Sequence, residues 1–225
     1  MNNCLDYYKS SIGKKQIVAT TGLLLILFIV GHLVGNLLVL LGPDAYNGYA
    51  KKLASLRPGL YLIEFGLFLV FLIHIITTAI LVLENIQSRP IRYQISKSKE
   101  ERSVAAQLMP YTGTILFVFV IWHLLDFTFV DHEGPLSIVR GKSCGLYGVV
   151  YNAFADPAHS YFYIVAMMAL GFHLAHGVQS FAQTSGFNDP RYTPLIEKIS
   201  NGFGLLITLA YSSIPIYVLF NYLSY

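Results

Sequence analysis

The sequence predicts an all-α membrane protein that folds as a bundle of five transmembrane helices. Apolar residues make up 55% of the 225 residues and charged residues only 12%, against roughly 25% charged residues in an ordinary soluble domain. Five segments are also long enough to cross a bilayer, since about 20 apolar residues span its hydrocarbon core. These predicted spans cover 16–41, 60–83, 111–130, 161–182 and 202–223.

The spans and their connections leave no room for a separate soluble domain. Lys14 and Lys15 precede the first span, but its apolar run is too long for a signal peptide, so we expect a retained anchor. The connection 131–160 is long enough to fold over one end of the bundle. The fifth span contains no histidine and is expected to serve packing. We find no internal repeat or soluble linker, so residues 1–225 are expected to form a single domain.

The basic residues predict the orientation of the chain, because short loops rich in Lys and Arg stay on the cytoplasmic side. With the N-terminus inside, ten of the fifteen Lys and Arg residues fall on inner segments. The sequence therefore predicts a multi-pass protein of the bacterial cytoplasmic membrane, with a cytoplasmic N-terminus and an external C-terminus. The net charge of +3 is too small to suggest a nucleic-acid partner. The ten inner residues are Lys9, Lys14, Lys15, Arg89, Arg92, Lys97, Lys99, Arg102, Arg191 and Lys198.

Five of the seven histidines lie inside the predicted spans. Ionisable side chains are costly in hydrocarbon, so they tend to face the bundle interior and to have a function. A single such histidine could be a satisfied hydrogen-bonding residue, but one on each of four consecutive spans is harder to explain in that way. The five are His32, His74, His123, His173 and His176.

Depth sorts these histidines into two pairs. Neighbouring spans run in opposite directions, and each histidine lies past the midpoint of its own span. His32 and His123 are therefore displaced outward, and we call them the outer pair. His74 and His173 are displaced inward, and we call them the inner pair. The sequence thus predicts two bis-histidine sites stacked along the membrane normal.

Two histidines on facing helices are a common way to hold a b-type haem in a helical bundle. The flat macrocycle needs small residues beside its ligands, and Gly31 and Gly35 flank His32. Glycines also serve close helix packing in membranes, which is the alternative interpretation. The second ring nitrogen of each ligand should donate a hydrogen bond, and Thr77 and Thr78 are the local candidates near His74.

The fourth ligand stays open at this level of argument. His176 follows His173 by three residues and so lies on nearly the same helix face. Either histidine could be the ligand from spacing alone, and the other could contact a haem propionate. Zinc is a weaker hypothesis, since no Cys or carboxylate shares these depths in a tetrahedral pattern.

Four fragments of the chain resemble one known family, the five-helix, di-haem cytochrome b membrane anchor (b558 type) of succinate dehydrogenase and fumarate reductase. The resemblance covers nearly the whole chain, and its strength lies in the order and spacing of the fragments. They are Gly31-His32-Leu-Val-Gly35-Asn36, His74 with Asn85 beyond it, His123-Leu-Leu-Asp126-Phe-Thr, and Gly171-Phe-His173-Leu-Ala-His176-Gly177-Val-Gln179-Ser180.

The resemblance implies two haem b groups as cofactors. Carried over by position, it implies that His32 and His123 are the axial ligands of the outer haem and that His74 and His173 are those of the inner haem. It favours His173 over His176, which is left as a propionate contact or alternative ligand. It also implies a flavoprotein subunit and an iron–sulfur subunit as partners on the cytoplasmic face, and a membrane quinone as substrate, with menaquinone the expected type.

Some relatives carry a carboxylate for menaquinone chemistry near the start of the second span, where this chain has Ala54. Glu64 is the nearest acid. An acid inside a membrane is a functional candidate by default, so we expect Glu64 to relay a proton at a quinone site beside the outer haem. A capping or packing role for Glu64 is the alternative.

The sequence therefore predicts a membrane anchor and electron-transfer subunit of a succinate:quinone oxidoreductase. The chain would contain no succinate site, so it would be a non-catalytic subunit of the complex. Two alternatives remain. One is the cytochrome b subunit of a formate dehydrogenase, hydrogenase or nitrate reductase. The other is a histidine-lined transporter without haem.

Overall fold

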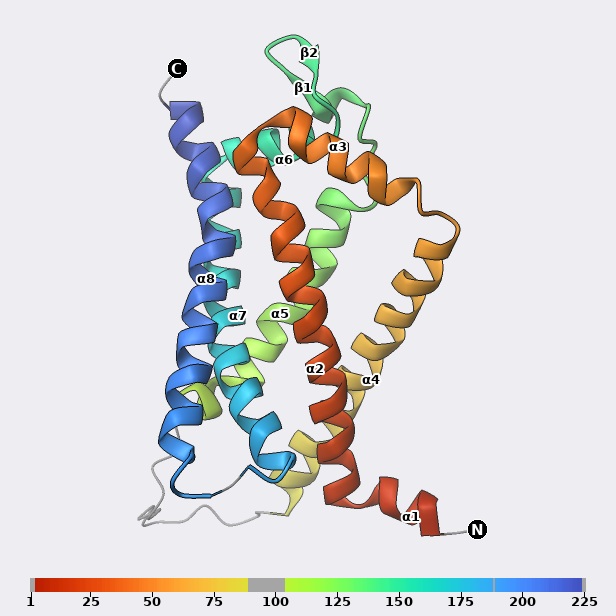
Figure 1. Ribbon diagram of the computed structural model, residues 1–225, viewed down its shortest axis with the longest axis vertical. Helices are drawn as coiled ribbons and strands as arrows, with labels where there is room; N and C mark the ends of the chain where they lie inside the picture. The colour runs from red at the N-terminus through yellow and green to blue at the C-terminus, as the bar shows by residue number, and fades with distance from the viewer. Residues whose placement is uncertain (1–2, 89–103, 188, 224–225) are drawn as a thin grey trace.

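A computed structural model describes residues 3–88, 104–187 and 189–223 of the chain (Figure 1). Long helices dominate it, and the two short strands pair as one antiparallel hairpin. In chain order the elements are α1 (Asn3–Lys9), α2 (Ser11–Asn36), the 3₁₀ helix η1 (Leu37–Leu41), α3 (Pro43–Ala54), α4 (Gly59–Gln87), α5 (Val104–Phe127), the 3₁₀ helix η2 (Pro135–Ser137), β1 (Ile138–Val139), β2 (Lys142–Ser143), α6 (Gly145–Ala155), α7 (Pro157–Thr184) and α8 (Thr193–Leu223).

Five stretches of helix are long and apolar enough to cross a membrane, which confirms the all-α, five-helix membrane fold. The first joins α2 to η1, and the other four lie in α4, α5, α7 and α8. Many of their large apolar side chains are exposed, as expected of a surface that faces lipid. The stretches are Ser11–Leu41, Gly59–Gln87, Gln107–Phe127, Pro157–Thr184 and Thr193–Tyr222.

The bundle has two ends, and an odd number of spans places the two termini at opposite ends (Figure 1). We call them the N-terminal face, which carries α1 and the α7–α8 connection, and the C-terminal face, which carries α3, α6 and the hairpin. Five of the ten basic residues assigned to the inner side lie outside the described residues. These five are Arg89, Arg92, Lys97, Lys99 and Arg102.

The core of the bundle is centred on α7, which packs most extensively against α8 and also contacts α5 and α2. Gly171 of α7 and Gly204 of α8 allow the closest approach. A Cβ atom on Gly204 would lie 2.4 Å from the Gly171 carbonyl oxygen. The Thr208 hydroxyl donates to the Met167 carbonyl across the same contact, at 3.1 Å. Gly171 and Gly204 therefore serve close helix packing, which is the alternative to glycines that make room for a haem.

Helix α4 lies at the edge of the bundle. It packs chiefly against α2, and none of its described side chains is buried. An ion pair between Lys14 and Glu84 joins the two helices near the N-terminal face. Because α4 carries His74, one ligand candidate stands on the least enclosed helix.

A cap of short elements closes the C-terminal face. The chain turns there at Gly42, whose φ of 96° favours glycine, and Pro43 starts α3. Asn47 of α3 joins the cap to α6: its amide donates to the Cys144 carbonyl at 2.7 Å, and its carbonyl oxygen accepts from the Tyr147 amide at 3.0 Å. The connection 131–160 therefore folds over this end, as its length predicts.

The helices differ from the predicted spans mainly at their ends. The third span is predicted at 111–130, but α5 starts at Val104 and ends at Phe127. Pro110 lies inside α5, and residues 128–130 are not helical. Apolar composition marks the hydrocarbon region, but it does not mark the residues at which the helix begins and ends.

Candidate functional site

The outer pair lies in contact between α2 and α5. The ring centroids of His32 and His123 are 5.8 Å apart, with an interplanar angle of 87°. Phe28 stacks on His32 at 5.2 Å, and Phe119 stacks on His123 at 5.6 Å. The buried Nδ1 atom of His123 has no hydrogen-bond partner among the described residues. The structure therefore brings the two outer histidines together in an aromatic environment.

The inner pair is held differently. The Thr21 hydroxyl oxygen of α2 lies 3.0 Å from Nδ1 of His74 on α4. The Thr112 hydroxyl oxygen of α5 lies 3.3 Å from Nδ1 of His173 on α7. His74 is also close enough to His173 to interact with it electrostatically. Each inner histidine thus has a polar partner on a neighbouring helix.

These hydrogen-bond partners differ from the local candidates. The Thr78 hydroxyl donates to the backbone carbonyl of His74, at 2.6 Å, and no described contact joins Thr77 or Thr78 to the His74 ring. A threonine inside a helix readily bonds the carbonyl four residues earlier. Thr21, which is distant in sequence, contacts the ring instead.

Thr21 and Thr112 were missed in the sequence, although a signal for them exists. Thr21 precedes His32 by eleven residues, Thr112 precedes His123 by eleven residues, and a glycine follows each threonine. Eleven residues make about three helical turns, so each threonine and histidine share a helix face about 16 Å apart along the axis. One short pattern therefore recurs in α2 and α5, although no internal repeat was expected.

The same spacing sets the two pairs at two levels of the bundle. Helix α2 carries Thr21 at the inner level and His32 at the outer level, and α5 carries Thr112 and His123 in the same order. The outer pair lies nearer the C-terminal face, and the inner pair lies nearer the N-terminal face.

A polar cluster that the sequence reasoning did not single out lies beside the outer pair. The Tyr163 hydroxyl donates to Oδ2 of Asp126 at 2.6 Å, and Nε2 of His159 lies 3.2 Å from the same oxygen. The Tyr163 ring stacks on His159 at 4.8 Å and stands 6.1 Å from the ring of His123. This cluster joins the end of α5 to the start of α7 at the outer level.

Two further candidates lie apart from these contacts. Nδ1 of His176 is buried without a hydrogen-bond partner among the described residues. Glu64 is about half exposed near the start of α4, where Oε1 lies 3.4 Å from Nη2 of Arg57. The Arg57 guanidinium also stands over the Tyr61 ring, 4.3 Å from its centroid.

A hydrogen-bonded chain connects the cap to the outer pair. The Tyr46 hydroxyl donates to the Asn36 side-chain oxygen at 3.2 Å, and the Asn36 amide donates to the His32 carbonyl at 2.8 Å. Burial, with a smaller contribution from Tyr49, raises the pKa of Tyr46 to about 12. Tyr46 therefore keeps its proton at neutral pH and stays a donor.

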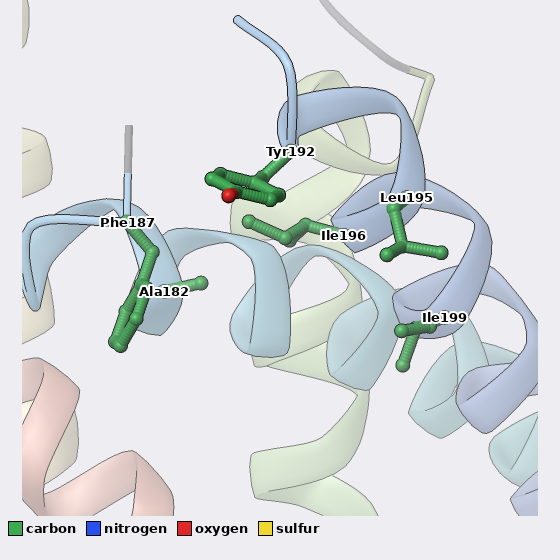
Figure 2. Close-up of a pocket in the computed structure, with 6 residues that line it drawn as sticks. All are labelled: Ala182, Phe187, Tyr192, Leu195, Ile196 and Ile199. Carbon is green, nitrogen blue, oxygen red and sulfur yellow. The ribbon is translucent and has the colours of Figure 1, made fainter. Parts of the chain in front are cut away.

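An apolar pocket opens at the N-terminal face, and Figure 2 shows its lining side chains. Ala182 is the lining residue that belongs to α7, and it lies nine residues beyond His173, about 14 Å along the helix axis. The pocket is therefore separate from both histidine pairs. Its lining residues are Ala182, Phe187, Tyr192, Leu195, Ile196 and Ile199.

Within the part of the chain that the structure describes, no three His, Cys, Asp or Glu side chains converge as a bare metal ion would require. The fold and the site together define a multi-pass helical membrane protein that carries paired histidines at two levels.

The chain is similar to the succinate dehydrogenase cytochrome b558 subunit of Bacillus subtilis (strain 168). The two are 26% identical over 196 residues, which cover 87% of this chain and 89% of that protein. This similarity confirms the resemblance that the sequence fragments indicate. No family model and no solved structure matches the chain.

Proposed function

We propose that this chain is the membrane-anchor and electron-transfer subunit of a succinate dehydrogenase or fumarate reductase. In this role it carries electrons between an iron–sulfur subunit and a membrane quinone, and two haem b groups are its cofactors. The single observation that supports the proposal most is the pairing of histidines from four helices at two levels. The name of the Bacillus subtilis relative, a cytochrome b558 subunit, agrees with it.

The distance between the two outer rings fits two imidazoles that bind the iron of one porphyrin. Two imidazoles bound to one metal ion have ring centroids roughly 6 Å apart, given metal–nitrogen bonds of about 2 Å. The observed centroid distance between His32 and His123 is 5.8 Å. His32 and His123 are the proposed ligands at this level.

The inner pair also fits an iron porphyrin, but the reason is its hydrogen bonding and not its spacing. Nδ1 of each inner histidine faces a hydroxyl of a neighbouring helix. Nε2 of each ring would then be the nitrogen that binds iron. Gly22 lies against His74 and Gly113 against His173, so small residues adjoin both rings. His74 and His173 are the proposed ligands at this level.

Haem b, when bound, supplies a one-electron redox centre at each level. The residues of this chain provide neutral imidazoles, hold their orientation and exclude water from the bundle interior. His176 lies one helical turn from His173, and we propose it as a propionate contact or an alternative ligand.

We also propose Glu64 as the residue that exchanges a proton with the quinone. It lies near the C-terminal face, at the outer level, and forms an ion pair with Arg57. Menaquinone is the proposed quinone. The flavoprotein and iron–sulfur subunits are proposed to bind the N-terminal face, with that face in the cytoplasm and the C-terminus outside.

The proposal is tested by purifying the full complex from native membranes through a tag on this chain. The reduced-minus-oxidised spectrum should show b-type haem, with two haems per chain by quantitative extraction. A succinate-oxidising flavoprotein should co-purify. A molybdenum or nickel protein in its place would support another respiratory complex, and a colourless chain would reject any electron-transfer role.

A further inference from the structure

The inner histidines share one local arrangement that the outer histidines lack. Each faces a Thr-Gly pair on a neighbouring helix, Thr21 and Gly22 for His74, and Thr112 and Gly113 for His173. Both threonine side chains are buried, at 8% and 6% exposure. The two arrangements come from different helix pairs, α2 with α4 and α5 with α7, so they support each other independently.

The direction of each hydrogen bond follows from the single proton of the hydroxyl. Oγ1 of Thr21 lies 2.7 Å from the Ile17 carbonyl oxygen, and Oγ1 of Thr112 lies 3.1 Å from the Leu108 carbonyl oxygen. Both contacts are shorter than those to the histidine rings. A carbonyl oxygen can only accept, so the hydroxyl proton goes to the carbonyl, and the hydroxyl oxygen accepts from Nδ1–H of the ring.

This direction decides the tautomer of the ring. A neutral imidazole carries one proton, so a histidine with Nδ1–H has its lone pair on Nε2. The lone pair is what a metal ion binds. The threonines therefore prepare both inner rings for coordination through the same nitrogen.

The glycines hold the rings in place. A Cβ atom on Gly22 would lie 3.3 Å from Cε1 of His74, and one on Gly113 would lie 3.6 Å from Cε1 of His173. Each ring edge therefore rests on the helix backbone directly beside the threonine that it bonds. A larger residue at Gly22 would push the His74 ring away from Thr21.

We propose that Thr21 and Thr112 are paired positioning residues that set the Nδ1–H tautomer of His74 and His173 and tune the iron at the inner level. This inference rests on the proposed function, since it assigns the two threonines a role at the inner haem. A hydrogen bond from Nδ1–H makes the ligand more basic. A more basic ligand favours ferric over ferrous iron and so lowers the reduction potential of the inner haem.

The test uses the full complex with Thr21→Val and Thr112→Val, which keep the side-chain shape and remove the hydroxyl. The two haem potentials are measured by redox titration followed in the visible spectrum. Loss of such a partner weakens metal binding by roughly 10–100-fold. The reduction potential of the inner haem should therefore rise. Each tenfold loss of binding affinity that affects only ferric iron raises this potential by about 59 mV. The outer potential should not change.

Matched controls stand on the same helices. Thr20 precedes Thr21 and is exposed, and exposed Thr114 donates to the Pro110 carbonyl at 2.9 Å but contacts no histidine. Thr20→Val and Thr114→Val should leave both potentials unchanged. Thr21→Ser and Thr112→Ser restore the hydroxyl and should return the inner potential towards the wild-type value.

Each outcome decides the inference. A rise confined to the inner haem, or loss of the inner haem signal that serine restores, supports it. If both valine variants keep two haems with unchanged potentials, the inference is overturned and the proposed function stays intact. The same holds if the control variants shift the inner potential as much as the valine variants do. A wild-type complex without haem overturns the proposed function as well.

Discussion

The inner histidines, His74 and His173, each face a threonine hydroxyl of a neighbouring helix, whereas the outer histidines, His32 and His123, lie among aromatic rings. Phe28 and Phe119 stack on the outer rings, and Nδ1 of His123 is buried without a partner among the described residues. The inner rings are oriented by hydrogen bonds, and the outer rings are oriented by packing.

This difference has a chemical consequence at each level. A hydrogen-bonded imidazole is a stronger electron donor than one without a partner. We therefore expect the two threonine hydrogen bonds to lower the potential of the inner haem. The outer level instead has the Asp126 carboxylate nearby, which accepts a hydrogen bond from Tyr163 and lies 3.2 Å from Nε2 of His159.

The largest expected effect comes from replacing the ligands themselves. His32→Leu and His123→Leu should each remove one and the same haem signal, and His74→Leu and His173→Leu should each remove the other, because one imidazole cannot form a bis-histidine site. Difference spectra of the purified complexes measure this. His132→Leu, outside the spans, is the control and should keep both signals. A signal shared by His32 and His74 would reject the pairing.

A second change tests whether the inner level depends on the α7–α8 contact. Gly204→Val should place side-chain atoms against the Gly171 carbonyl, where a Cβ atom would already lie at 2.4 Å. Overpacking of this kind costs about 3 kcal/mol. Because Gly171 is two residues from His173, the inner haem signal should be lost at a lower temperature than the outer signal.

Thermal denaturation, followed through both haem signals, checks this expectation. Gly202→Val is the matched control on α8, since Gly202 is exposed and its Cβ position has no neighbour within 4 Å. It should change neither melting temperature. Equal loss of both signals in Gly204→Val would show that the bundle fails as one unit.

Much of the fold was predictable because apolar composition and length are enough to define a membrane span. The positions of the ends were not predictable to the same degree. Pro110 resembles a helix start in the sequence, yet α5 begins six residues earlier, at Val104. Hydropathy reports where lipid is expected, and it does not report where backbone hydrogen bonding ends.

The site was predictable in its histidines and not in the residues that hold them. Thr78 was a local candidate for His74, but a threonine in a helix satisfies its proton on its own backbone, and Thr78 bonds the His74 carbonyl. Which neighbouring helix presents Thr21 to the ring depends on tertiary packing. Only the repeated Thr-Gly pair, eleven residues before each outer histidine, carries that information in the sequence.

A third change acts on the outer level alone. Tyr163→Phe removes the hydroxyl that donates to Asp126 at 2.6 Å. A hydrogen bond to a charged group contributes about 2 kcal/mol, so the stability of the complex should fall by that order. The outer haem signal should shift and the inner signal should not. Denaturant titration and difference spectra measure the two effects.

Tyr161→Phe provides the control for this change, since Tyr161 lies on the same helix, two residues earlier, and is exposed. It should leave stability and both signals unchanged. A shift of the inner signal in Tyr163→Phe would mean that the two levels are coupled through α7.

The smallest expected effect is that of His176→Leu, which separates the two candidates for the fourth ligand. His173 has the threonine partner on α5 and interacts with His74, whereas Nδ1 of His176 is buried without a partner among the described residues. Removing an unpaired polar group costs little, so stability should change by less than about 1 kcal/mol. Both haem signals should persist, with at most a small shift of the inner potential from a lost propionate contact. Loss of the inner signal here, together with its survival in His173→Leu, would transfer the ligand role to His176.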